Sequence, residues 1–505
     1  MISYINKTLI SLFIIISFFS LIFFLSTSNF PIDRHWSSVY DNELTLAYNA
    51  LLFNSAKLQE FTDHSGYFTI LFLSIFFKIL SFFDFLTIYK ITLFNQNNNL
   101  DQDLQNIIYF TRLFGMFSVS LFCLVAFWTF ELFSKNKFFS FLITIILFLS
   151  LGTHNHFFQL RNELFSMIFF IMSFFSLSLF FLEKKNFITK YLIFFFLFLF
   201  CAILNKAQAF FYLPFILLII HFIKSEKKVY FNFDNYKFLE NKNASNYLYA
   251  FVILYFTLKL FTGTTSFLSI IFISLNILFI NIFFYIHLKK NGSDINKNLK
   301  IINFLLLISY ILFKFILSAH PSTNEVAFNN TFTDIINNTF KYTRTFYEDK
   351  SILYLILDVF IIFKQQLFTT FSNINYYSFL ISTSMLLNFV NIKNKQSIFF
   401  NLSCIFSFFL IASINGLRGA TSSYYIFSDF FLILSFTSFS NIFNKKFYVL
   451  LIPILVMIYF LNYPIIKGII LPQDKIQVLC NDTYFYDWHK NISPQRFKEF
   501  CNNNL

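Results

Sequence analysis

Long uncharged apolar segments recur from one end of the chain to the other, and they constrain its fold more than any other feature. A helix needs roughly 17–25 apolar residues to cross the ~30 Å hydrocarbon core of a bilayer. Because backbone groups in lipid must bond within their own segment, such runs form helices. They lie at 8–27, 67–84, 107–133, 138–151, 164–182, 187–204, 207–223, 249–263, 266–288, 301–318, 351–371, 377–391, 397–414, 422–441 and 447–463. The chain is therefore predicted to be an all-α polytopic membrane protein.

Composition and charge agree with lipid as the main solvent. Apolar residues make up 57% of the 505 and charged residues only 12%, a balance that would expose large apolar patches on a soluble domain. The net charge of +13 comes from short clusters of lysines between the apolar runs, which we call the basic knots. That placement is typical of cytoplasmic loops, so the charge is interpreted as topology and no nucleic-acid partner is expected.

The basic knots also limit which runs can cross the membrane. If every run crossed, Lys135 and Lys137 and several later knots would lie outside. Run 67–84 contains Lys78 and run 351–371 contains Asp358 and Lys364, so both are predicted to lie along the outer interface. About 13 crossings then remain, with the N-terminus inside.

This topology divides the chain into a membrane region and a tail. Residues 1–463 form the membrane region, including a first extracytoplasmic loop at 28–106 with juxtamembrane helices. Residues 464–505 form a small extracytoplasmic tail. The other predicted outer segments are 152–163, 205–206, 319–376 and 415–421.

Carboxylates gather in the first outer loop, where Asp41 and Glu43 are followed by Asp63 and His64. A carboxylate at the membrane surface can take the proton from a hydroxyl that attacks a sugar, so Asp41 and Glu43 are candidate catalytic bases, with Asp63 and His64 in support. The alternative is a solvated loop with an acid capping the helix predicted at 43–53.

Isolated cations occur on the later outer segments. Arg161, Lys206 and Arg418 are candidate ligands for the phosphate of a lipid-linked donor, because a guanidinium or ammonium stabilises phosphate charge. Glu163 is a supporting residue. Contact with lipid headgroups would also explain the cations, and capping of the following helix would explain Glu163.

The order of these motifs resembles that of the integral-membrane glycosyltransferases with the GT-C fold, the ArnT and protein-mannosyltransferase group (glycosyltransferase family 39 type). An acidic pair in the first outer loop corresponds to Asp41-Asn42-Glu43, and a His-Pro-type helix start to Asp63-His64-Ser65. An Arg-Pro-Glu-like element corresponds to Arg161-Asn162-Glu163, and a Thr-Lys-Gly-like element to Asn205-Lys206-Ala207. Arg112 stands at the family's arginine position. The match covers roughly residues 1–220.

The resemblance implies an inverting glycosyltransferase. Its donor would be a polyprenyl-phosphate monosaccharide and its acceptor a lipid, a glycan or a protein. The protein would be a multi-pass protein of the bacterial inner membrane with its active site facing outward. Some relatives use a divalent cation, but no cofactor or metal is predicted here. The alternatives are a transporter or flippase for a lipid-linked glycan, and a polymerase or ligase of surface polysaccharide.

Overall fold

The described part of the chain is helical throughout. The computed structural model describes residues 2–29, 32–36, 42–57, 66–94, 100–157, 159–182, 188–222, 267–290, 295–318, 352–372, 375–390, 394–416 and 425–440. No strand occurs in these ranges. Their helices are α1 (Ile2–Asn29), α2 (Asn42–Asn54), α3 (Tyr67–Phe82), α4 (Ile91–Phe94), α5 (Leu100–Ser134), α6 (Lys137–Phe148), α7 (Leu151–His154), α8 (Asn162–Leu182), α9 (Ile188–Asn205), η2 (Ala207–Tyr212), α10 (Leu213–His221), α12 (Phe267–Lys290), α13 (Ile295–Ser318), α15 (Ile352–Ser372), α16 (Tyr376–Val390), α17 (Lys395–Gly416), α18 (Tyr425–Leu434) and η6 (Ser435–Phe439).

Four of these helices are long and apolar enough, by length and composition, to cross a membrane. They are Asn6–Leu25 of α1, Asp101–Ser134 of α5, Asn162–Leu182 of α8 and Lys395–Gly416 of α17. Several shorter apolar helices accompany them, such as Lys137–Phe148 and Lys190–Asn205. The all-helical, membrane-compatible character predicted from the sequence is confirmed, while the number of about 13 crossings stays a prediction.

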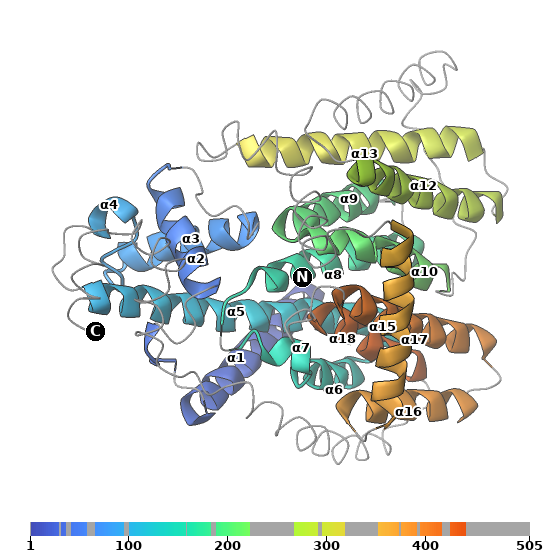
Figure 1. Ribbon diagram of the computed structural model, residues 1–505, viewed down its shortest axis with the longest axis horizontal. Coiled ribbons are helices and arrows are strands. Elements are labelled where there is room, and N and C mark those ends of the chain that lie inside the picture. Colours follow the sequence, from blue (N-terminus) through green and yellow to red (C-terminus); the bar gives the residue numbers. More distant parts are fainter. Residues whose placement is uncertain are drawn as a thin grey trace.

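Helix α5 is longer than one membrane crossing requires. Its 35 residues span about 52 Å at 1.5 Å per residue, against a hydrocarbon core of ~30 Å. Its first turn carries Asp101 and Asp103. Helices α2 and α3 lie beside this end of α5, with α4 next to them (Figure 1). The predicted helices at 43–53 and 67–84 thus exist, as α2 and α3. Helix α3 also packs on the bundle, where Phe68 lies 5.0 Å from Phe169 of α8 between ring centroids.

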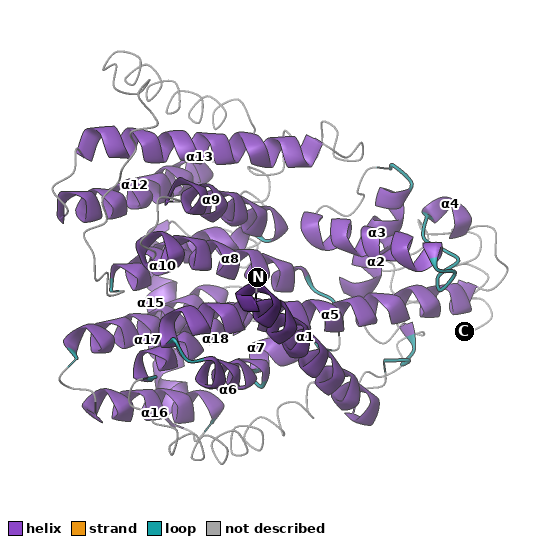
Figure 2. Ribbon diagram, turned by 180° about the vertical axis from the view of Figure 1, so that it is seen from behind, coloured by secondary structure: helices purple, strands orange, loops and turns teal. Residues whose placement is uncertain are grey.

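Aromatic rings and serine hydroxyls hold the larger bundle together. Phe133 stacks on Phe174 with 5.6 Å between ring centroids, which joins α5 to α8. The Ser166 and Ser173 hydroxyls of α8 donate to backbone carbonyls of α9 at 2.9 and 3.0 Å. Lipid gives helices no hydrophobic reason to associate, so ring packing and interhelical hydrogen bonds supply the specificity. Figure 2 shows α13 above α9 and α12, with α8 on the other side of α9.

Helix α15 takes a different course from its neighbours. It crosses the direction shared by α12, α13 and α17 (Figure 1) and is not among the helices that meet the criteria for a membrane span. It packs on α17, where Phe363 contacts Phe409 with 6.0 Å between centroids. That 351–371 does not cross the bilayer stays a prediction.

Polar contacts gather several loop-flanking residues at one end of the bundle. Asn205, which ends α9, donates to the carbonyl of Asn162 at 2.6 Å and contacts Thr69 of α3. Tyr212 donates to the Asn415 amide oxygen near the end of α17. The outer segments predicted from the basic knots therefore adjoin helix ends that do meet in space. Which side of the membrane they face stays a prediction.

Candidate functional site

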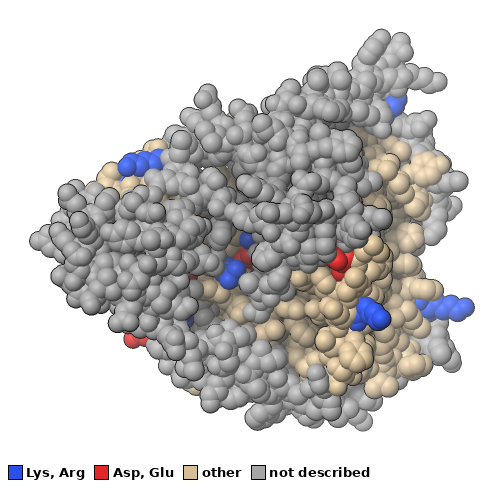
Figure 3. All heavy atoms as spheres, viewed as in Figure 1, with Lys and Arg blue, Asp and Glu red and all other residues tan. Residues whose placement is uncertain are grey.

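Two clusters, each with one carboxylate between two cations, contain the predicted site residues that the structure describes. Glu43 belongs to the first, and Glu163, Arg161 and Lys206 to the second. On the face drawn in Figure 3, the described Lys, Arg, Asp and Glu side chains appear at a few separate places among uncharged ones. Asp41, Asp63, His64 and Arg418 lie outside the described residues, so their predicted roles are untested.

The first cluster, which we call the Glu43 cluster (Arg34, Glu43 and Arg112), is sealed. Glu43 Oε2 accepts from Arg112 Nε at 3.0 Å, and Glu43 Oε1 lies 3.5 Å from an Arg34 guanidinium nitrogen. The side chains of Glu43 and Arg112 are 0% and 1% exposed. Burial lowers the pKa of Arg34 to about 10, despite the opposing attraction of Glu43. Each carboxylate oxygen therefore faces a guanidinium in a nearly dry environment.

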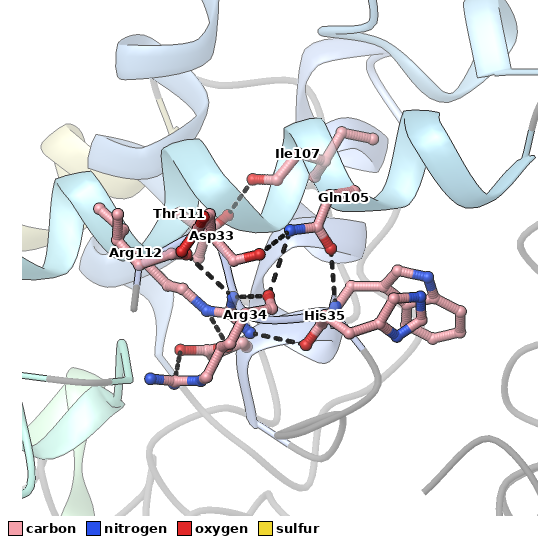
Figure 4. A network of polar contacts seen from close by, with 10 residues as sticks. Asp33, Arg34, His35, Gln105, Ile107, Thr111 and Arg112 are labelled. Atoms are coloured by element: carbon pink, nitrogen blue, oxygen red, sulfur yellow. Dashed lines mark hydrogen bonds and ion pairs between the residues drawn. The ribbon is translucent and has the colours of Figure 1, made fainter. Parts of the chain in front are cut away.

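Arg112 also holds the backbone of the preceding loop. Its guanidinium donates to the carbonyls of Ile32, Arg34 and His35 (Figure 4). About two turns earlier on α5, Gln105 donates to the carbonyls of Asp33 and Arg34 and accepts from the Trp36 amide.

Asp101 extends the same attachment. It accepts from the Trp36 indole at 2.7 Å and lies 3.0 Å from His35 Nε2. Hydrogen bonds from Asp101, Gln105 and Arg112 thus hold residues 32–36 against the first half of α5. The arginine position singled out by the family resemblance is occupied, but Arg112 acts here as a cross-link between α5, this loop and Glu43 of α2.

The second cluster, which we call the Glu163 cluster (Arg161, Glu163 and Lys206), is partly open. Lys206 Nζ lies 3.0 Å from Glu163 Oε1, and Arg161 Nε lies 3.3 Å from Glu163 Oε2. The Glu163 side chain is 2% exposed, while those of Lys206 and Arg161 are each 14% exposed. Two cations around one carboxylate leave a net positive charge, which favours an anionic ligand.

Local structure fixes the members of the Glu163 cluster. Glu163 is in the first turn of α8, where the helix dipole stabilises a negative charge. Lys206 is the single residue between the end of α9 and η2, and its amide still donates to Ala202 at 2.9 Å. The neighbouring Asn205 side chain ties α9 to α3 and α8, so Lys206 projects from a junction of three helices. The structure brings Arg161 and Lys206 together around Glu163, and their role as phosphate ligands stays a prediction.

The segment that leads into the Glu163 cluster contains two buried histidines. His156 is fully buried and lies within electrostatic reach of Glu163. His154 is 5% exposed, and neither ring nitrogen has a hydrogen-bond partner among the described residues. Burial lowers its pKa to about 3, so the ring is neutral near pH 7.

Sequence reasoning missed three residues that shape these sites. Arg34 gave no signal, because its partner Glu43 is known only once the loop is folded. Asp429 of α18 is fully buried and accepts from the Gly152 amide at 3.0 Å. A lone acid in an apolar helix is itself a signal, since intramembrane charges are rare and functional. Asn205 appeared only as part of a motif, although it organises the junction.

Comparison with known proteins adds no further assignment: neither a protein-family model nor a curated protein sequence matches the chain. Within the described residues, no three His, Cys, Asp or Glu side chains group as metal ligands. The expectation that the protein needs no metal stays a prediction.

Proposed function

We propose that the protein is a membrane glycosyltransferase that takes a sugar from a polyprenyl-phosphate donor and passes it to a lipid, glycan or protein acceptor. The observation that carries the proposal is the Glu163 cluster, in which Lys206 and Arg161 flank one buried carboxylate and remain partly exposed. In a site with little water, such cations stabilise the charge that a departing phosphate develops.

In the proposed reaction the two loop regions divide the chemistry. Asp41 takes the proton from the acceptor hydroxyl as its oxygen attacks the anomeric carbon. The bond from that carbon to the phosphate oxygen breaks, the configuration inverts, and the phosphate keeps the electron pair beside Lys206 and Arg161. Glu43 is the weaker candidate for the base, because both of its oxygens already face guanidinium groups and its side chain is 0% exposed.

The finer architecture belongs to the same proposal. We infer a GT-C-like membrane domain with about 13 crossings, in a bacterial inner membrane, whose site faces outward. Support comes from the long apolar helices and from the convergence of the Asn205, Asn162 and Thr69 contacts at one end of the bundle. The first loop, with the Glu43 cluster and the proposed base, would then lie on the outer side of the membrane.

The test is sugar transfer from a polyprenyl-phosphate donor in nanodiscs, with donor binding measured separately. Asp41→Asn keeps the side-chain shape but removes the proton acceptor, so turnover should fall about 10²–10⁴-fold while donor binding survives. Lys206→Ala should weaken both. Wild-type transfer by Asp41→Asn would eliminate Asp41 as the base, and absence of transfer by the wild-type protein with any polyprenyl-phosphate sugar would count against the enzyme.

One observation favours a second candidate, a flippase for lipid-linked glycans. Asp429 is a fully buried carboxylate within the apolar helix α18, and transporters place ionisable residues on such helices. A flippase would move a fluorescent lipid-linked glycan across vesicles without changing it chemically. Translocation that Lys206→Ala abolishes, together with unchanged substrate, would replace the transferase proposal.

A further inference from the structure

The proposed chemistry leaves the buried carboxylate of Asp429 unused. Asp429 Oδ2 accepts a hydrogen bond of 3.0 Å from the amide of Gly152, a residue 277 positions earlier in the chain. This bond joins α18, in the second half of the sequence, to α7, in the segment that leads into the Glu163 cluster. Burying a carboxylate costs free energy unless it is hydrogen-bonded, and the Gly152 amide supplies such a bond. A buried carboxylate with a specific backbone partner is therefore a candidate for a functional role.

Gly152 lets the two backbones touch. A Cβ atom at this position would lie 2.2 Å from the Ile426 nitrogen and 2.5 Å from the Tyr425 carbonyl carbon. Both are backbone atoms of the first turn of α18, which cannot move aside as a flexible side chain can. Glycine is therefore required for α7 to approach α18 closely enough for the Gly152 amide to reach Asp429.

Other groups around Asp429 hold the same segment. The Ser150 hydroxyl, which precedes α7, and the Tyr377 hydroxyl of α16 lie within electrostatic reach of the carboxylate. Tyr376, next to Tyr377, donates to the Ile146 carbonyl of α6 at 3.1 Å. Helices α16 and α18 thus contact the chain on both sides of the turn between α6 and α7.

From α7 the restraint reaches the Glu163 cluster. Turn hydrogen bonds of 3.0 Å join the His156 amide to the Thr153 carbonyl and the Phe157 amide to the His154 carbonyl. His156 is fully buried and lies within electrostatic reach of Glu163. The links from Asp429 to His156 are thus hydrogen bonds and turn contacts, and the last step, from His156 to Glu163, is electrostatic.

We propose that Asp429 is a positioning residue for the phosphate-binding cluster: through Gly152 it fixes residues 150–157, and with them His156 beside Glu163. The inference rests on the proposed function for the meaning of the cluster. It assigns a role to the C-terminal helices, which is to hold the loop that shapes the cationic site built by the N-terminal half.

The test compares three variants in nanodiscs, with polyprenyl monophosphate as the probe. Asp429→Ala removes the acceptor and should weaken binding roughly 2–12-fold, the size expected when a hydrogen bond of about 0.5–1.5 kcal/mol is lost. Asp429→Asn keeps an oxygen that accepts from Gly152 and should bind within about twofold of wild type. Gly152→Ala should match Asp429→Ala, because it forces the same two backbones apart.

A matched control separates positioning from general destabilisation. Asn401 of α17 is a buried amide that contacts Ser384 and Asn388, in the same half of the chain but outside the path from Asp429 to Glu163. Asn401→Ala should lower the unfolding temperature and leave probe affinity unchanged. Equal losses of affinity for Asn401→Ala and Asp429→Ala would overturn the proposal.

Hydrogen exchange of residues 150–157 distinguishes failure of this inference from failure of the proposed function. Their amides should exchange faster in Asp429→Ala but not in Asn401→Ala. If Lys206→Ala loses the probe while Asp429→Ala keeps it, the inference fails and the phosphate site stands. If wild type does not bind the probe, the proposed function fails, and unchanged exchange in Asp429→Ala would reject the restraint on the loop as well.

Discussion

The Glu43 and Glu163 clusters have the same ionic composition but differ in exposure. Each places one carboxylate between two cations. In the Glu43 cluster the side chains of Arg112 and Arg34 are 1% and 8% exposed, and Arg112 is further engaged by three backbone carbonyls. In the Glu163 cluster both cations are 14% exposed.

That difference separates a structural role from a binding role. A sealed ion pair whose donors are already used has little left for a ligand, but it fixes the loop and helices that meet at it. A partly open pair can exchange part of its solvation for a phosphate without first breaking the fold. Counting charges in the sequence gives both clusters equal weight, and only the surroundings of each carboxylate distinguish them.

The largest expected effect is on stability, at Glu43. Glu43→Ala leaves two buried guanidiniums without their carboxylate, and removing one partner of a buried pair costs about 3–5 kcal/mol. We expect low yield and a strongly lowered unfolding temperature in detergent. Glu163→Ala is the matched control and should cost clearly less, because its cations can recover water. Equal destabilisation by the two substitutions would erase the distinction between the clusters.

The next effect is on ligand binding, at Lys206. Lys206→Ala should weaken polyprenyl monophosphate binding by roughly 10–100-fold, which corresponds to about 1.5–3 kcal/mol for a hydrogen bond to a charged group. Its unfolding temperature should change little. Lys90→Ala is the control, since Lys90 lies in the predicted first outer loop with its ammonium 5.0 Å from the Tyr89 ring centre. Comparable losses of binding in both variants would mean that the attraction is diffuse.

A smaller effect on stability is expected at Asn205. Its amide contacts Thr69 and donates to the Asn162 carbonyl, so Asn205→Ala should cost about 1–3 kcal/mol by leaving buried groups without partners. Because Lys206 follows directly, phosphate binding should weaken too. Asn281→Ala removes a comparable amide pair with Asn303 between α12 and α13, and it should lower stability without affecting binding.

The helices were the predictable part of this fold. Runs 164–182 and 397–414 correspond to α8 and α17 within about two residues, because an uncharged apolar run in lipid has no other way to bond its backbone. Run 207–223 was wrong as a single helix. Pro214 lacks an amide hydrogen and stands at the start of α10, so the chain before it forms the separate 3₁₀ helix η2.

For the candidate site, the sequence predicted which residues take part but not how they pair. Arg161, Glu163 and Lys206 stood out as isolated charges beside apolar runs, and the structure brings them together. Their pairing was not readable, because it depends on how α8 and α9 end against each other. The bond between Arg112 and Glu43 joins residues 69 positions apart, and no local pattern encodes such a distance. Asp429 was readable as a lone buried acid but not as the partner of Gly152.

The smallest expected effect near neutral pH concerns acid stability, and it also separates the two clusters. Burial lowers the pKa of His154 from 6.5 to about 3, so below pH 6.5 the unfolded chain binds a proton that the folded protein does not. Stability should therefore fall as the pH drops from 6.5 towards 3, by at most about 1.4 kcal/mol per pH unit. Arg34, whose pKa is about 10, keeps its charge over this range, so the Glu43 cluster gains no pH dependence from it.

Chemical unfolding in detergent between pH 7 and pH 5 measures this effect. Subtracting the profile of His154→Leu from that of the wild type isolates the histidine from the other titrating groups. The difference should be flat near pH 7 and grow towards pH 5, and hydrogen exchange should show that residues 150–157 open first in acid. A flat difference down to pH 5 would mean that His154 is protonated as easily in the folded protein as in the unfolded chain. The segment beside the Glu163 cluster would then be no more acid-sensitive than the loop held by Arg112.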